Sequence, residues 1–182
     1  PVECVPSESG APVGDGCGVF VATSGADKNT GTKASPVATL TKAIEIAAKK
    51  NGRVYVCDET FNEALVINSN VELYGGLDCA NAWAYVGDTK KTTLTASADA
   101  IPITMTSSAN GSSIVDLAVH AVDAVKEGGS SIAVIADDAT AEPGRRDEWV
   151  LPPDADVCVL GRWSAEGALL PHWARTSGIP VY

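Results

Sequence analysis

Short β-prone runs recur in the middle of this chain at intervals of about 20 residues. VELYG, TTLTA, SIVDL and SIAVI begin at residues 71, 92, 113 and 131, and turn-forming runs of Asn, Gly, Asp and Ser separate them. A repeat of this length is typical of a β-solenoid, in which each coil buries its inward face against the next coil. The spacing therefore predicts a mainly β fold, a short parallel β-helix of about four coils.

A β-sandwich is the alternative architecture. It would place turn signals every ~8–12 residues and would join its strands by hairpin dipeptides. The longer steps between the runs favour the solenoid. The predicted strands lie at residues 19–22, 54–57, 64–67, 71–74, 92–95, 101–105, 114–119 and 132–136.

One segment has helical periodicity. Ser35-Pro36 can begin a helix, because Ser caps free N–H groups and Pro is tolerated at the first helical position. Gly52 can end it. We predict a helix over residues 37–50 that caps the N-terminal end of the solenoid. Its apolar stripe consists of Leu40, Ala43, Ile44 and Ala47.

The chain divides into three parts by composition. Residues 1–17 are rich in Pro, Gly and Ser and form an extended lead-in, and residues 18–141 form the predicted β-helix. Residues 142–182 contain three of the four Trp and five of the ten Pro, and the repeat stops there. We predict a small β-rich C-terminal unit for this last part, or a cap over the open end of the solenoid.

The net charge of −10 limits the classes of partner. Affinity for nucleic acids and for anionic membranes depends on Lys and Arg, so neither is an expected partner. No stretch reaches the about 20 apolar residues of a membrane-spanning helix. The hydrophobic content of 45% is typical of a folded domain.

The five cysteines fall into two local pairs and a remainder. Cys4 and Cys17 form one pair, Cys57 and Cys79 the other, and Cys158 is left over. No CxxC motif is present, so a zinc site is not expected. We predict two disulfides, which fit an oxidising compartment.

The N-terminal motifs resemble those of a known class of proteins. A G-x-D-x-N-x-G-T turn at residues 25–32, the Pro-led helix and Val54-Tyr55-Val56 are similar to the opening of secreted parallel β-helix proteins of the pectin-lyase-like superfamily. The run VYVC…VELYGGLDCANAWAYV resembles cell-surface proteins and lipoproteins of myxobacteria. The resemblance covers roughly residues 17–140. It implies a right-handed β-helix and an extracellular or cell-surface location, with a lipid anchor before processing. The run EWVLPPDADVCVLG resembles a separate small bacterial and archaeal β-domain.

The turn at residues 25–32 is also a candidate calcium loop. Asp27, Asn29 and Thr32 offer alternating oxygen ligands, which Ca²⁺ prefers. The preferred interpretation is an ordinary turn, in which Asx side chains bond their own backbone and Gly31 takes a positive φ. Calcium is the one cofactor that the sequence indicates.

Two further candidate sites are weaker. Trp83 and Tyr85 can stack on a sugar ring, or else pack against the nearby disulfide. Asp137-Asp138 resembles the paired aspartates of β-helix pectinases, but the His and Arg partners that those enzymes use are missing here. His120 is the one histidine of the predicted β-helix, and we interpret it as a strand residue on the outer face. We therefore assign no catalytic residue.

Three functions remain open at this point. The first is a non-catalytic secreted cell-surface protein that acts in adhesion, binding or extracellular assembly. The second is a polysaccharide lyase or hydrolase of the pectin-lyase-like superfamily. The third is a protein–protein interaction module that docks through its C-terminal tail. The expected partners are a carbohydrate, a protein or a second copy of the chain.

Overall fold

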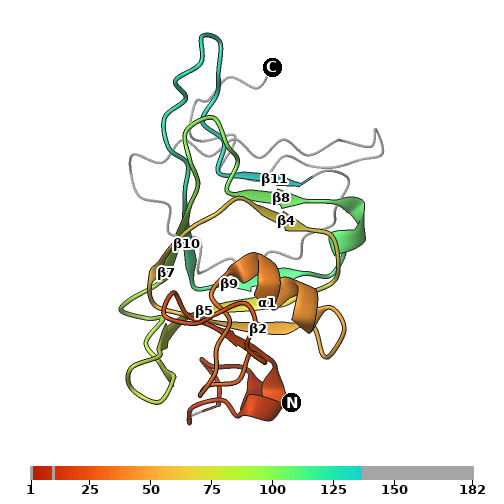
Figure 1. The fold of residues 1–182 in the computed structure, drawn as a ribbon, viewed down its shortest axis with the longest axis vertical. Coiled ribbons are helices and arrows are strands. Elements are labelled where there is room, and N and C mark those ends of the chain that lie inside the picture. The colour runs from red at the N-terminus through yellow and green to blue at the C-terminus, as the bar shows by residue number, and fades with distance from the viewer. Residues whose placement is uncertain (1, 10, 137–182) are drawn as a thin grey trace, which may run out of the picture.

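The computed structural model describes residues 2–9 and 11–136. Over these residues the fold is mainly β, with parallel strands and one α-helix (Figure 1). The predicted C-terminal unit, Cys158 and the Asp137-Asp138 pair lie outside the described residues. Three short 3-10 helices complete the elements: η1 (Val2–Cys4), η2 (Asp15–Cys17) and η3 (Ser107–Ala109).

Within residues 11–136, the strands form three parallel sheets. The first contains β1 (Val19–Val21), β2 (Arg53–Cys57), β5 (Glu72–Asp78) and β9 (Ser113–Val115), with β6 (Ala84–Tyr85) antiparallel to β5. The second contains β3 (Thr60–Asn62), β7 (Thr92–Thr95) and β10 (Leu117–His120). The third contains β4 (Leu65–Ile67), β8 (Ile103–Met105) and β11 (Val134–Ala136).

The chain visits the three sheets in the same order on each pass. β2, β3 and β4 make the first coil, β5, β7 and β8 the second, and β9, β10 and β11 the third, so the described part is β-helix-like. The strand register stacks the apolar residues of successive coils on one another, so that each coil buries its inward face against the next. The inward rows are Val54–Leu73–Ile114, Phe61–Leu94–Val119 and Leu65–Ile103–Val134.

The step of about 20 residues is not the coil length, and the expectation of about four coils was wrong for the described part. The runs that begin at residues 71, 92, 113 and 131 lie in the first, second, first and third sheets. Coil length varies. Arg53 at the start of the first coil pairs with Glu72 of the second coil, but Glu72 pairs with Ser113 of the third coil, which lies much further along the chain. The second coil is longer because it includes an excursion over residues 79–91. Strands β3 and β6 were not predicted.

Helix α1 (Leu40–Ala47) is shorter than the predicted segment 37–50. Val37 forms a parallel bridge with Val21, and this extended conformation delays the helix beyond Ser35-Pro36. Thr39 is the N-cap instead, with its hydroxyl accepting a hydrogen bond from the Lys42 N–H. The whole predicted apolar stripe is buried.

The helix covers the interior that the sheets surround. In Figure 1, α1 lies across the space enclosed by the strands of the first coil, and it packs on β1, β2 and β4. Glu63, at the turn between β3 and β4, accepts hydrogen bonds from the N–H groups of Leu40 (2.7 Å) and Thr41 (3.1 Å). A carboxylate at this position also complements the helix dipole.

The outward face of the first sheet carries a second apolar layer. Phe20, Tyr55 and Tyr74 stack along it, with ring centroids 5.0 and 5.6 Å apart. The N-terminal segment covers this layer, and Figure 1 shows that segment in red beneath β2 and β5. The first sheet is therefore buried on both faces, which explains why β1 is buried without alternation.

Two disulfides brace this outer layer, as the sequence predicted. Cys4 is bonded to Cys17 and Cys57 to Cys79, each with Cα atoms 5.3 Å apart. The first bond closes the lead-in over the aromatic layer. The second joins the end of β2 to the start of the excursion.

Among the described helices, none is long and apolar enough to cross a membrane.

Candidate functional site

A surface hollow of about 320 Å³ lies beside the Cys57–Cys79 disulfide. Four segments form it: the chain after β1, the loop before α1, the turn between β2 and β3, and the excursion after β5. Parallel pairing of β1, β2 and β5 brings these segments to the same edge of the first sheet. The residues that matter for its chemistry are Lys33, Glu59, Cys79 and Trp83.

The excursion forms one wall through a strained turn. Ala82 and Trp83 both have positive φ, 54° and 63°, and the Ala84 N–H donates to the Asn81 carbonyl at 3.0 Å. A non-glycine residue in this region costs about 1–2 kcal/mol. The adjacent disulfide and the packing of Trp83 on Phe20, with ring centroids 4.9 Å apart, offset that cost. Strained backbone of this kind is often found at functional sites.

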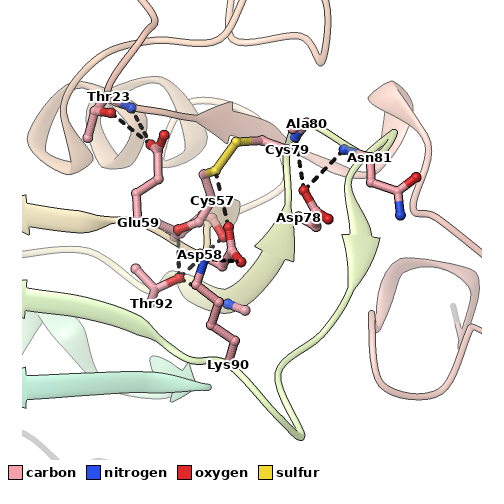
Figure 2. Close-up of a disulfide and its surroundings, with 12 residues drawn as sticks. Thr23, Cys57, Asp58, Glu59, Asp78, Cys79, Ala80, Asn81, Lys90 and Thr92 are labelled. Atoms are coloured by element: carbon pink, nitrogen blue, oxygen red, sulfur yellow. Dashed lines mark hydrogen bonds and ion pairs between the residues drawn. A yellow bond between two sulfur atoms is a disulfide. The ribbon is translucent and has the colours of Figure 1, made fainter.

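Glu59 contributes the carboxylate of the hollow. Its Oε2 accepts hydrogen bonds from the backbone N–H and the hydroxyl of Thr23, at 2.8 and 2.9 Å (Figure 2). The side chain is thereby fixed between β1 and the β2–β3 turn. The sulfurs of Cys57 and Cys79 and one carboxylate oxygen of Glu59 all lie within 4.8 Å of one another.

The charges around the disulfide are partly paired. Asp58 forms an ion pair with Lys90 (2.7 Å), and the hydrogen bond that the Lys90 ammonium donates to Asp58 raises the pKa of that ammonium. Asp78 accepts hydrogen bonds from the N–H groups of Ala80 and Asn81, as Figure 2 shows. Lys33 brings a cation to the hollow, and its ammonium lies 5.7 Å from the ring centroid of Phe20.

The predicted calcium loop is organised around the entry to α1. Asp27 Oδ1 accepts hydrogen bonds from the N–H groups of Ala38 (2.9 Å) and Thr39 (3.0 Å), and Asn29 Nδ2 donates to the Pro36 carbonyl at 2.9 Å. Thr32 forms an isolated bridge with Ser35. These contacts are those of a turn, and the calcium site stays a prediction.

Trp83 and Tyr85 have different surroundings. Trp83 is only 4% exposed and lines the hollow with a small part of its side chain. The hydroxyl of Tyr85, which is not among the lining residues, donates to Asp116 Oδ2 at 2.8 Å. The structure therefore does not bring the two rings together as one stacking surface. A carbohydrate contact of either residue stays a prediction.

Sequence reasoning did not identify Lys33, Glu59 or Thr23 as residues of one site. Glu59 follows Cys57 closely, which was the available local signal. Its approach to Cys79 and Thr23 depends on the register of β2 against β1 and β5, which no local pattern encodes.

Stacked parallel strands and a two-sided first sheet braced by disulfides define a β-helix-like protein with a hollow at one sheet edge. The model of the family described as "Protein of unknown function (DUF1565)" matches residues 23–122, more than half of the chain, so the chain belongs to this family. The family is associated with pectin-lyase-like β-helix proteins. No curated protein and no solved structure gives a significant match.

Proposed function

We propose that the protein is a non-catalytic, secreted cell-surface protein that acts in adhesion or extracellular assembly by binding carbohydrate at the hollow. The observation that carries the proposal is the composition of that hollow. Lys33, Glu59 and Trp83 line one opening. Charged groups of both signs next to an apolar surface suit the hydroxyl groups and the C–H faces of a sugar.

The finer features of the fold belong to the same proposal. Connections between parallel strands of one sheet are right-handed in ≈ 98% of cases, which supports a right-handed β-helix. Two disulfides in the described part support an oxidising, extracellular location. An adhesive surface protein benefits from such bonds, because they hold the hollow in shape outside the cell.

The number of carboxylates at the hollow and their hydrogen bonds support binding rather than hydrolysis. Most glycoside hydrolases use two carboxyl groups about 5–9.5 Å apart. Among the described residues that line the hollow, Glu59 is the one carboxylate, and Thr23 already holds its Oε2. Asp27 and Glu63 likewise accept hydrogen bonds from backbone N–H groups at the entry to α1.

A glycan array with bacterial exopolysaccharide and cell-wall fragments tests the proposal. Titration calorimetry then measures Kd for the best oligosaccharide with three variants: Lys33→Gln, Glu59→Gln and the exposed control Lys49→Gln. We expect the first two to raise Kd at least about tenfold, a loss of about 1.4 kcal/mol, and the control to leave it unchanged.

The same oligosaccharides and a set of polyuronides are also incubated with the protein, with and without Ca²⁺. We expect no release of unsaturated uronides. Release that Asp138→Ala abolishes would establish the lyase alternative instead. Absence of binding to every glycan, or equal Kd values for all variants, would contradict carbohydrate binding at the hollow.

A further inference from the structure

The disulfide at the hollow has a third potential ligand beside it. The sulfurs of Cys57 and Cys79 and one carboxylate oxygen of Glu59 lie within 4.8 Å of one another, and Figure 2 shows Glu59 beside the bonded sulfurs. Within the described residues, no other such group of His, Cys, Asp and Glu side chains is found. In the oxidised protein the sulfurs bond to each other, so they cannot bind a metal.

Reduction would convert these three groups into zinc ligands. Zn²⁺ binds thiolate sulfur at about 2.3 Å and carboxylate oxygen at about 2.0–2.2 Å, so the ligand atoms of a tetrahedral site lie about 3.6–3.8 Å apart. The three groups now lie within 4.8 Å of one another, so a shift of about 1 Å of the carboxylate and separation of the two sulfurs on reduction would bring them to the spacing of one ion. Three protein ligands leave the fourth tetrahedral position open.

The surroundings orient the oxygen ligand. Thr23 donates two hydrogen bonds to Oε2 of Glu59, which hold the carboxylate beside the sulfurs. Hydrogen bonds of this kind orient metal-binding carboxylates in other proteins. Asp58 and Asp78 adjoin the two cysteines in the sequence, and of these two, Asp58 is paired with Lys90.

The two sulfurs differ in their access to solvent. Cys57 is completely buried, whereas Cys79 is partly exposed and lines the hollow together with Glu59. A reductant or an ion can therefore reach the site through the hollow. The hollow would also hold whatever occupies the fourth position on the ion.

We propose that the reduced protein binds one Zn²⁺ through Cys57, Cys79 and Glu59, with the open position toward the hollow. A dithiol reductant supplies two electrons and two protons to the disulfide and becomes a disulfide itself. Binding of Zn²⁺ then displaces both thiol protons to the solvent. The ion and the disulfide exclude each other, so the site reports the redox state of the compartment. This proposal does not depend on carbohydrate binding.

The test uses the full chain with Cys4→Ser, Cys17→Ser and Cys158→Ser, which retains only the pair at the hollow. Titration calorimetry under anaerobic conditions measures Zn²⁺ binding before and after reduction with a phosphine, and circular dichroism monitors the fold. We expect no binding before reduction and one Zn²⁺ per chain afterwards. Glu59→Gln should weaken binding about 10–100-fold, while Glu127→Gln, at an exposed position, should not.

Differential alkylation of the reduced wild-type chain is a second readout that does not need the triple variant to fold. Compared with the reduced chain without Zn²⁺, added Zn²⁺ should slow the alkylation of Cys57 and Cys79 and leave that of Cys4 and Cys17 unchanged. An unchanged alkylation rate of Cys57 and Cys79, no binding after reduction, or equal affinity of the Glu59→Gln variant would overturn the proposal. The same affinity in concentrated urea would also overturn it, since two thiols of an unfolded chain would then account for the binding.

Discussion

The ammonium of Lys91 lies 2.6 Å from Oδ1 of Asp116, whose carboxylate also accepts the hydrogen bond of the Tyr85 hydroxyl. Asp116 separates β9 from β10 with a positive φ of 57°, and its side chain is 2% exposed. Lys91 and Tyr85 belong to the excursion that also carries Trp83. The contact therefore fastens the far end of that excursion to the third coil.

This contact predicts an asymmetry between its two partners. Lys91→Met should destabilise the protein by about 2–3 kcal/mol, because it leaves a buried carboxylate without its cation. Asp116→Asn should cost only about 1 kcal/mol, since Asn tolerates a positive φ and the released ammonium, 39% exposed, can be hydrated. Urea denaturation at pH 7 measures both. Equal losses of stability, or a larger loss for Asp116→Asn, would show that burial of the Asp116 carboxylate does not require the ion pair with Lys91.

The buried tyrosines predict a loss of stability at alkaline pH. Burial raises the pKa of Tyr74 to about 12, and burial also raises the pKa of Tyr55, whose hydroxyl donates to the Cys4 carbonyl at 2.7 Å. Because the folded state holds these protons more tightly than the unfolded chain, the stabilisation is complete below pH ~10 and is lost as pH rises toward 12.

Tyrosinate absorbance against pH checks this behaviour. Tyr55 and Tyr74 should ionise late, together with the loss of folded structure, and Tyr55→Phe should remove one late-ionising group. Ionisation of all four tyrosines near pH 10 in the folded protein would contradict the buried positions of these side chains.

The disulfides predict a defined thiol count and a defined contribution to stability. Non-reducing mass spectrometry should find one free thiol, at Cys158. In the chain-entropy model, loops that close over separations of 13 and 22 residues stabilise by about 3 kcal/mol each. Cys57→Ser with Cys79→Ser should therefore lower the free energy of unfolding by about that amount. Five free thiols in the protein would contradict both bonds.

The buried face of α1 predicts a cost for its truncation. Leu40 is fully buried against the coil interior, so Leu40→Ala should destabilise by about 2–4 kcal/mol. Lys42→Ala, at a half-exposed position of the same helix, serves as the control and should cost far less, since the ion pair that it removes is with an exposed residue, Glu45. A loss of stability below about 0.5 kcal/mol for Leu40→Ala would mean that packing of α1 on the first coil contributes little to the stability of the protein.

The open edges of the third coil predict that the protein associates when residues 142–182 are removed. In the described part, β9, β10 and β11 each lie at the edge of a sheet, and the inward residues Ile114, Val119 and Val134 are only partly buried. Unpaired edges next to apolar surface favour pairing with another chain. A chain cut after residue 141 should therefore oligomerise or aggregate in size-exclusion chromatography. A soluble monomer as heat-resistant as the full chain would show that residues 142–182 cover nothing essential.

Local patterns in the sequence determined where most elements lie and which residues they bury. Short β-prone runs located strands in each of the three sheets, although they missed β3 and β6. The apolar stripe located α1, and close spacing paired Cys57 with Cys79 and Cys4 with Cys17. These features depend on neighbours along the chain, so sequence alone can predict them.

The tertiary structure decided which strands pair and which side chains meet. The bridge from Val37 to Val21 shortened the helix, and pairing of Glu72 with Ser113 made the second coil longer than the apparent repeat. The approach of Glu59 to the disulfide and of Lys91 to Asp116 also follows from strand register between distant segments. Such contacts depend on how the coils stack, and the residues involved carry no periodic signal of their own, so only the folded chain could reveal them.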